Sequence, residues 1–385
     1  MHRSTSICRF SLLPLLVTTL VACSSPPQIP TTDQIAPTRV AVAPSATTQP
    51  TATIEPTQTS EPTATTAPTV TIAPTLEPTP NPDVSRVTGA QTFARGAITQ
   101  RPWMVMIDNH PDAYPQSGMN QASMVFEGLA EYGITRFIAL YQDRDDLPSV
   151  DEIGPVRSTR LYFAQWAMGF HPVYAHAGGS PDGVHLAETT DQLTNFEALQ
   201  LPGYTWRDTN RLAPHNLYTS STLLRQFAQD QRVRPFDDQT VGYLFDTIPA
   251  ASTIEASSIN YYFLDHVFRA GWTYDPLSNG YHRTMRDQAH VDRVTGEQLW
   301  TRNLVVMQVN EAARLGDDKQ RIDQEVIGSG AARVFFAGRN IAATWRKDSE
   351  ATSLRFYDDA GQEIVFNAGP IWVAAIPGMD HLTAR

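Results

Sequence analysis

The stretch Trp103-Met-Val-Met-Ile-Asp108 decides what kind of fold this chain adopts. It places five apolar residues in succession and then ends on a carboxylate. An unbroken apolar run of this length is typical of a buried strand. We therefore expect a sheet in this region, with polar residues gathered where the strand ends.

Strand and helix patterns alternate on the C-terminal side of this stretch. Turn residues such as Tyr132-Gly133 separate the strands, and Ser220 or Ser221 is placed to cap the last helix. The predicted elements are strands at 122–128, 134–142 and 173–176 and helices at 158–169 and 219–231. This mixture predicts an α/β domain over residues 86–238.

After residue 238 the pattern changes to short strands joined by turn dipeptides. Asn279-Gly280, Thr295-Gly296 and Ala360-Gly361 are typical hairpin turns, and helix signals are scarce. We predict an antiparallel β domain over residues 239–385, so that the whole chain is of the α+β class.

The segment from residue 23 to residue 85 has a different composition. Between residues 24 and 85 it holds 13 prolines and 16 threonines, with no glycine and no aromatic residue. A segment of this composition buries too little apolar surface to offset the entropy that its chain would lose on folding. We predict a disordered stalk.

The chain begins with a pattern of export. Arg3 and Arg9 precede an apolar run of about 11 residues, which is too short to span a membrane and fits a signal peptide over residues 1–22. The run ends in Leu20-Val-Ala-Cys23, which resembles the bacterial lipobox. That resemblance implies acylation of Cys23 and an extracytoplasmic protein held to the bacterial membrane by lipid.

Composition excludes several classes of function. The mature chain would keep no cysteine besides Cys23, because Cys8 leaves with the signal, so a disulfide, a thiol nucleophile and a thiolate metal site are excluded. The net charge of −11 argues against nucleic acid as a partner. Of the 29 cationic residues only Lys319 and Lys347 are lysines, so arginine is the available ligand for anions.

Reactive polar residues concentrate in four loops of the first domain. These loops are Asp108-Asn109-His110, Gly154-Pro-Val-Arg157-Ser158-Thr-Arg160, His176-Ala-Gly178-Gly179-Ser180, and Arg207-Asp208 with Pro214-His215-Asn216. Two of the four follow predicted strands, and ligands of α/β sheets bind beyond the strand ends. We expect a binding site there.

The arginine loop and the glycine loop each allow two interpretations. Arg157 and Arg160 either recognise an anion near a helix start or bridge Asp108, Glu127 or Glu131 internally. Gly178-Gly179 either forms an anion-holding nest or a tight turn with a core-facing His176. Ser180 as a nucleophile is disfavoured because the loop lacks a Gly-x-Ser-x-Gly elbow.

No cofactor is predicted. A divalent metal held by His110, His176 and His215 has little support, because no metal-binding spacing is present. Four tryptophans of the second domain are expected in its core, and a carbohydrate-stacking face is the alternative. They are Trp272, Trp300, Trp345 and Trp372.

Taken in order, the loops resemble those of the YerB-like lipoproteins, a family with a two-part domain of unknown function on bacterial cell surfaces. The matching motifs are 105–110, 115–118, 133–137, 153–160, 176–180 and 214–216, and the similarity covers roughly residues 95–378. The resemblance implies the two-part architecture and a surface location. It implies no catalytic residues, so the site residues depend on their own chemistry.

Two functions of different classes follow. In the first, the protein binds an anionic envelope ligand: a glycan, a peptide carboxylate or a polyprenyl phosphate. In the second, it is a non-catalytic scaffold for an envelope protein, and a metal-dependent or serine-type hydrolase is a further alternative. The predicted ligand-binding residues are Asn109, Arg157, Ser158, Arg160, Gly178, Gly179, Ser180, Arg207 and Asn216, and Asp108, His176 and His215 are predicted to orient the ligand or transfer protons.

Overall fold

A computed structural model describes residues 95, 100–144, 147–235, 240–264 and 268–385. The predicted signal peptide, Cys23 and the predicted stalk lie outside these residues. The predicted domain boundary at 238 and 239 also falls in an undescribed segment, 236–239, and stays a prediction. None of the helices in the described ranges combines the length and the apolar character that crossing a membrane requires.

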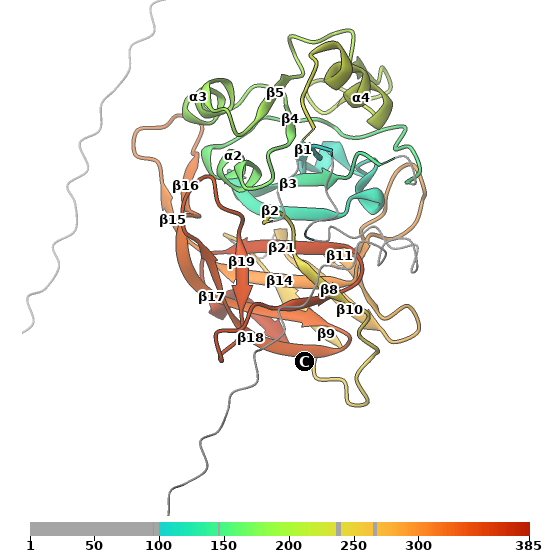
Figure 1. The fold of residues 1–385 in the computed structure, drawn as a ribbon, viewed down its shortest axis with the longest axis vertical. Helices are drawn as coiled ribbons and strands as arrows, with labels where there is room; N and C mark the ends of the chain where they lie inside the picture. Colours follow the sequence, from blue (N-terminus) through green and yellow to red (C-terminus); the bar gives the residue numbers. More distant parts are fainter. Residues whose placement is uncertain (1–94, 96–99, 145–146, 236–239, 265–267) are drawn as a thin grey trace, which may run out of the picture. The chain divides into compact units, whose positions relative to one another are not determined.

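A ten-stranded sheet forms the centre of the fold, and it runs from strands of the first half of the chain into strands of the second (Figure 1). Its strands, in spatial order, are β19 (Arg355–Tyr357), β18 (Arg339–Lys347), β17 (Gly328–Phe336), β14 (Asn303–Gln308), β21 (Ile371–Ile376), β2 (Met124–Glu131), β3 (Ile134–Tyr141), β1 (Trp103–Asp108), β4 (Val173–His176) and β5 (Thr194–Glu197). Strand β21 joins the two halves, because it pairs in parallel with both β2 and β14.

A second, antiparallel sheet packs on one face of the first. It contains β12 (Gln288–Ala289), β11 (Gly280–Met285), β10 (Ala270–Asp275), β9 (Ser258–Tyr261) and β22 (Leu382–Ala384), with β13 (Trp300–Thr301) paired to β11. Trp272 of this sheet meets Trp372 of the large sheet edge to face, with ring centroids 5.2 Å apart. The mixed sheet and the antiparallel sheet confirm the predicted α+β class.

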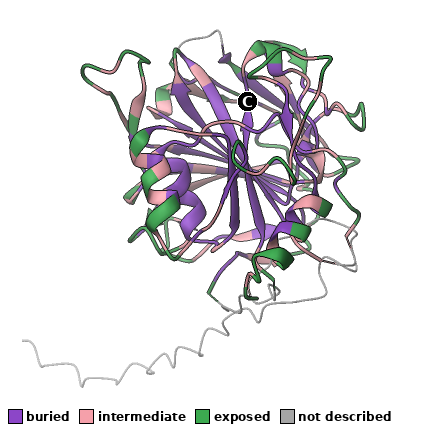
Figure 2. Cartoon of the chain, turned by 90° about the horizontal axis from the view of Figure 1, so that it is seen from above, coloured by how far each residue is buried: buried purple, intermediate pink, exposed green. Residues whose placement is uncertain are grey.

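Both faces of β1 are buried, as its apolar run predicts. Trp103, Val105 and Ile107 join the core shared with the antiparallel sheet, whereas Met104 and Met106 join the core on the opposite face. The strands at the centre of Figure 2 are buried throughout, and the helices expose only their outer sides.

The described residues contain three α-helices, which lie beside the strands from the first half of the chain. They are α2 (Leu161–Met168), α3 (Pro181–Thr189) and α4 (Ser221–Asp230). Ser220 caps α4 through its hydroxyl, which accepts the Leu223 N–H at 3.2 Å, as predicted. The predicted helix at 158–169 begins later, at Leu161. Helix α3 was not predicted, although Ser180-Pro181 is a typical helix start.

Three short strand pairs complete the structure. They are β15 (Asn310–Ala313) with β16 (Ile322–Glu325), β8 (Leu244–Asp246) with β20 (Val365–Asn367), and β6 (Trp206–Arg207) with β7 (Leu217–Tyr218). The β6–β7 pair carries the loop with His215, and the β15–β16 hairpin lies beside the β2–β3 turn, where the backbones of Glu131 and Arg321 form a bridge.

Candidate functional site

One buried carboxylate gathers polar side chains from separate loops. Asp108 is the last residue of β1, and its side chain is 3% exposed. Its Oδ2 lies 3.0 Å from Arg157 Nε and 2.7 Å from His215 Nδ1. Its Oδ1 accepts a hydrogen bond of 3.0 Å from the backbone N–H of His110. We call these four residues the Asp108 cluster.

Backbone pairing brings Arg157 to this position. The segment before α2 runs beside β1, where the N–H of Asp108 donates to the carbonyl of Pro155 and the N–H of Arg157 donates to that of Met106, each at 2.9 Å. Arg157 is therefore fixed at the strand end by main-chain hydrogen bonds before its side chain forms any contact.

Asn216 gives the His215 loop its shape. Its Nδ2 donates to the carbonyls of Asp208 and Arg211, both at 3.1 Å, and its Oδ1 accepts from Arg207 Nη1 at 2.7 Å. Asn216 and Arg207 therefore support the loop that carries His215. Their predicted contact with a ligand stays a prediction.

The electrostatics keep Asp108 ionised. Burial would raise the pKa of its carboxyl, but the hydrogen bond with His215 and the nearby cations of Arg157 and Arg136 outweigh it, so the pKa of Asp108 is lowered. An ionised Asp108 accepts a hydrogen bond from His215 Nδ1–H, and this contact orients the ring.

The outer nitrogens of the Asp108 cluster have no partner among the residues that the structure describes. Arg157 faces Asp108 through Nε, and His215 faces it through Nδ1. Within the described part of the chain, no hydrogen bond involves the two Nη groups of Arg157 or Nε2 of His215. The side chains are 23% and 11% exposed, so both remain open to solvent at one side.

His110 stacks on His215 and limits what the cluster can do with a metal. Nitrogen and oxygen atoms of His110, Asp112 and His215 lie within 4.8 Å of one another, a spacing that a metal could use. The two rings, however, are stacked with centroids 4.4 Å apart and planes 17° apart. Metals bind imidazole nitrogens in the plane of the ring, so nearly parallel rings cannot both reach one ion unless one rotates. A metal site here stays a hypothesis.

Arg160 turns away from the Asp108 cluster. It is 5% exposed, and its guanidinium pairs with Glu131, which also pairs with Arg136. Burial, with the nearby cation of Arg321, lowers the pKa of Arg160 to about 10. Of the two arginines predicted to share one ligand, Arg157 lies at the open cluster and Arg160 is paired internally.

The glycine loop already holds a carboxylate of the protein. The N–H of Gly178 donates to both oxygens of Glu197, each at 3.0 Å. His176 is fully buried, and its ring nitrogens face Asn195 Oδ1 at 2.9 Å and the carbonyl of Gly178 at 3.0 Å. Of the two interpretations, the structure agrees with the core-facing His176, and the Gly178 N–H holds a carboxylate of the protein itself. His176 does not join the Asp108 cluster.

Three other predicted residues have structural partners. The hydroxyl of Ser180 is buried and accepts the N–H of Gly183 at 3.3 Å, as the cap of α3. Gly179 lies against Thr159, where an added Cβ would come within 2.6 Å of Thr159 Cγ2. Asn109 is buried and bonds Thr135 and Gln116. Ser158 is half-buried and follows Arg157 in the chain, and its carbonyl accepts a hydrogen bond from Arg136 Nη1 at 3.0 Å.

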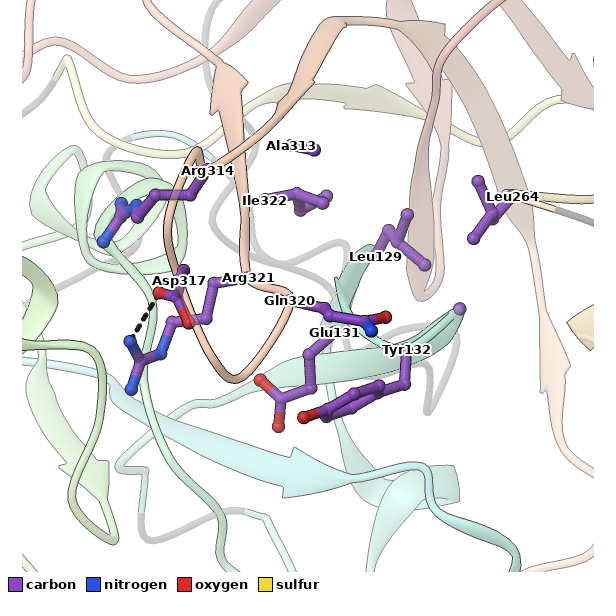
Figure 3. Close-up of a pocket in the computed structure, with 11 residues that line it drawn as sticks. Leu129, Glu131, Tyr132, Leu264, Ala313, Arg314, Asp317, Gln320, Arg321 and Ile322 are labelled. Atoms are coloured by element: carbon purple, nitrogen blue, oxygen red, sulfur yellow. Dashed lines mark hydrogen bonds and ion pairs between the residues drawn. The ribbon is translucent and has the colours of Figure 1, made fainter. Parts of the chain in front are cut away.

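Glu131 also lines a pocket of about 490 Å³. The β2–β3 turn and the β15–β16 hairpin line it, and Figure 3 shows the charged Arg314, Asp317 and Arg321 on one side and Leu129 and Leu264 on the other. Arg321 Nη1 pairs with Asp317 at 2.6 Å, and Arg314 Nη2 pairs with Asp182 at 2.7 Å. Its charged residues are therefore already paired within the protein.

A buried polar chain supports the cluster from behind. Arg283 Nη2 donates to Glu127 Oε1 at 2.9 Å, and both side chains are fully buried. Arg283 Nε donates to His290 Nδ1 at 3.1 Å, His290 Nε2 donates to Gln116 Oε1 at 2.7 Å, and Gln116 Nε2 donates to the carbonyl of Asp108 at 2.9 Å. This hydrogen-bonded network was not predicted from the sequence. The one available signal was Glu127, a charge inside the apolar run 122–128.

Comparison with known proteins follows the same two halves. The family "Protein of unknown function (DUF3048)" matches twice, by its N-terminal domain over residues 87–234 and its C-terminal domain over residues 259–373. The protein named "Putative lipoprotein YerB" from Bacillus subtilis (strain 168) is 30% identical over 297 residues, which are 76% of this chain and 86% of that protein. The crystal structure of the YerB protein from Bacillus subtilis matches with a TM-score of 0.65 and 27% identity, over 75% of this chain and 94% of that one.

Proposed function

Because this chain belongs to the DUF3048 family of proteins of unknown function and is similar to a protein named as a lipoprotein, we propose that it is a lipid-anchored envelope protein that binds an anionic ligand at the Asp108 cluster. The family itself brings no activity. The proposal depends on the geometry of the cluster, and the anchor depends on Cys23 in the sequence.

One observation carries the proposal. A single carboxylate oxygen, Asp108 Oδ2, holds both Arg157 and His215 by one nitrogen each, and their remaining nitrogens have no partner within the described residues. The arrangement resembles a half-completed recognition site, in which an ionised acid positions the donors and a second anion would complete their hydrogen bonds. Such charge-assisted hydrogen bonds are about twice as strong as neutral ones.

The donors suit a carboxylate or a phosphate. The two Nη groups of Arg157 form a planar fork that matches two oxygens of either anion, and His215 Nε2 can add a third contact. The stacked rings of His110 and His215 supply a flat aromatic face beside them. If the ligand is also transformed, His215 is the proton-transfer group, because Asp108 orients its ring.

Replacement of Arg157 by lysine tests the binding site. Lysine keeps the charge but loses the fork, so Arg157→Lys should reduce binding of inorganic phosphate or acetate about tenfold while leaving the ligand-free melting temperature nearly unchanged. Thermal shift and calorimetric titration of the full-length protein in detergent measure both quantities. Arg269→Lys is the matched control, because Arg269 pairs with Asp287 on the exposed surface.

Two outcomes would count against the site. One is a wild-type protein that responds to neither anion. The other is an Arg157→Lys protein that is destabilised without ligand by roughly 1 to 3 kcal/mol, which would show that Arg157 serves Asp108 alone. Either result would leave the scaffold as the remaining function of the two.

A further inference from the structure

Trp300 differs from most other tryptophans of this protein. Five of the seven are buried, each 1–3% exposed: Trp103, Trp166, Trp272, Trp345 and Trp372. Trp300, which was expected in the core, is only half-buried and lines an open hollow of about 570 Å³. Gly280 of β11 lies beside its ring, where an added Cβ would come within 3.1 Å of the indole. The indole is therefore held against the sheet and still borders solvent.

Arg302 lies over this indole and has no acidic partner among the described residues. Its guanidinium carbon is 5.6 Å from the centre of the Trp300 ring. Its Nε is buried without a hydrogen-bond partner, and no described residue forms an ion pair with its guanidinium. Most other half-buried or buried arginines described above pair with a carboxylate. An unpaired, partly desolvated cation is costly, and a bound anion would remove that cost.

The rest of the hollow is polar and carries both donors and acceptors. Ser278, His282, Glu297 and Gln298 complete its lining. Glu297 is exposed, and no described cation pairs with its carboxylate. Carboxylate and amide side chains beside an aromatic ring can accept hydrogen bonds from vicinal hydroxyl groups. A ligand with many negative charges would be repelled by Glu297, whereas a hydroxylated ring with one anionic group fits.

We propose that this hollow binds an acidic saccharide, with a sugar ring stacked on Trp300 and its carboxylate or phosphate group on Arg302. Hydroxyl groups of the same sugar contact Glu297 and Gln298. The residues that line the hollow lie between positions 278 and 302, in and next to the antiparallel sheet, and none of them belongs to the Asp108 cluster. It is independent of the function proposed above.

Titration of the full-length protein with three sugars tests the proposal. The probes are N-acetylmuramic acid, which carries a carboxylate, glucose 1-phosphate, and the neutral N-acetylglucosamine. We expect at least one acidic sugar to bind at least tenfold more tightly than the neutral one, by calorimetry and saturation-transfer NMR. The stronger of the two acidic probes identifies the anionic group.

Variants assign the binding to the hollow. Arg302→Gln should abolish the preference for the acidic sugar, and Trp300→Ala should reduce the affinity for all three sugars tenfold or more. Trp206→Ala is the control, because Trp206 is the other half-buried tryptophan and packs on Tyr218 with ring centroids 6.0 Å apart. If Trp300→Ala does not fold, as judged by circular dichroism, Trp300→Phe with Arg302→Gln replaces it.

Three results would overturn the proposal. Equal affinity for the neutral and acidic sugars would exclude a role for Arg302, and no binding of any sugar would exclude the site. Unchanged affinity in both variants would place the binding elsewhere. Arg157→Lys should leave unchanged the part of the sugar binding that Trp300→Ala and Arg302→Gln remove, so failure here is distinguishable from failure at the Asp108 cluster.

Discussion

Asp108 ends an apolar strand, and its carboxylate would be costly to bury without partners. The partners come from residues 49 and 107 positions later in the chain, Arg157 and His215. They turn a buried acid into the organiser of an open cluster. Glu197 has a similar effect on the Gly178 loop. Its carboxylate accepts the hydrogen bond of the Gly178 N–H, so this N–H is not available to a ligand.

The ionised state of Asp108 predicts how stability depends on pH. The pKa of its carboxyl is lowered in the folded protein, so its contribution is present above the unfolded value of about 3.9 and is lost as pH falls through the folded value. At pH 7, Asp108→Asn should lower the free energy of unfolding by about 1 to 3 kcal/mol, because Arg157 loses its carboxylate. At pH 2 to 3 the difference from wild type should shrink.

Urea unfolding of both proteins at pH 7 and pH 3 measures this dependence. Asp112→Asn is the control, because its side chain is 71% exposed. A cost for Asp108→Asn that is equal at both pH values would show that shape, and not charge, is what the cluster needs from Asp108.

At the scale of elements, β2 and β11 are joined by the buried pair of Glu127 and Arg283. Arg283 also lies over the rings of Trp372, Trp272 and Phe137, at 4.5, 5.3 and 5.7 Å from their centres. Both halves of the chain therefore contribute to one charged core. Its hydrogen bonds continue through His290 to Gln116, and burial together with Arg283 lowers the pKa of His290 well below its usual range, so the ring is neutral.

A double-mutant cycle tests this link. Glu127→Gln or Arg283→Met alone should cost about 3 to 5 kcal/mol of unfolding free energy, because each leaves one charge buried without its partner. The double variant should cost clearly less than the sum of the two. Chemical denaturation measures all four proteins. Additive costs would mean that the two side chains act separately.

At the scale of the whole molecule, the ten-stranded sheet joins strands from both halves of the chain into one structural unit, because β21 lies between β2 and β14. The N-terminal region is predicted from the sequence to carry a lipid anchor at Cys23. Its predicted lipid would tether the folded part to the membrane, since each buried methylene of an acyl chain contributes about 0.8 kcal/mol.

Loss of the anchor should release the protein. Cys23→Ala removes the predicted acylation site, so a processed variant should move from the membrane fraction to the soluble fraction after ultracentrifugation of cell lysates. Asp33→Ala, a nearby change outside the lipobox, is the control. A variant that is cleaved after residue 22 and still sediments with membranes would contradict the predicted anchor.

Local sequence patterns were sufficient to predict several elements of the fold. The apolar run of β1, the strands β2 and β3, helix α4 with its Ser220 cap and the family resemblance were all predicted and are confirmed. Each of these depends on residues within one short segment, or on several motifs in one order.

Which polar groups remain available to a ligand depends on long-range contacts that local sequence patterns do not show. The sequence offered Arg157 and Arg160 as equals, and long-range contacts separated them: Glu131 occupies Arg160, whereas Asp108 leaves part of Arg157 open. In the same way, local sequence does not distinguish Trp300 from Trp372, yet only Trp372 is in the core, and Trp300 lines a hollow beside Arg302. Pairing energies depend on distances between residues far apart in the chain, and no local pattern records those distances.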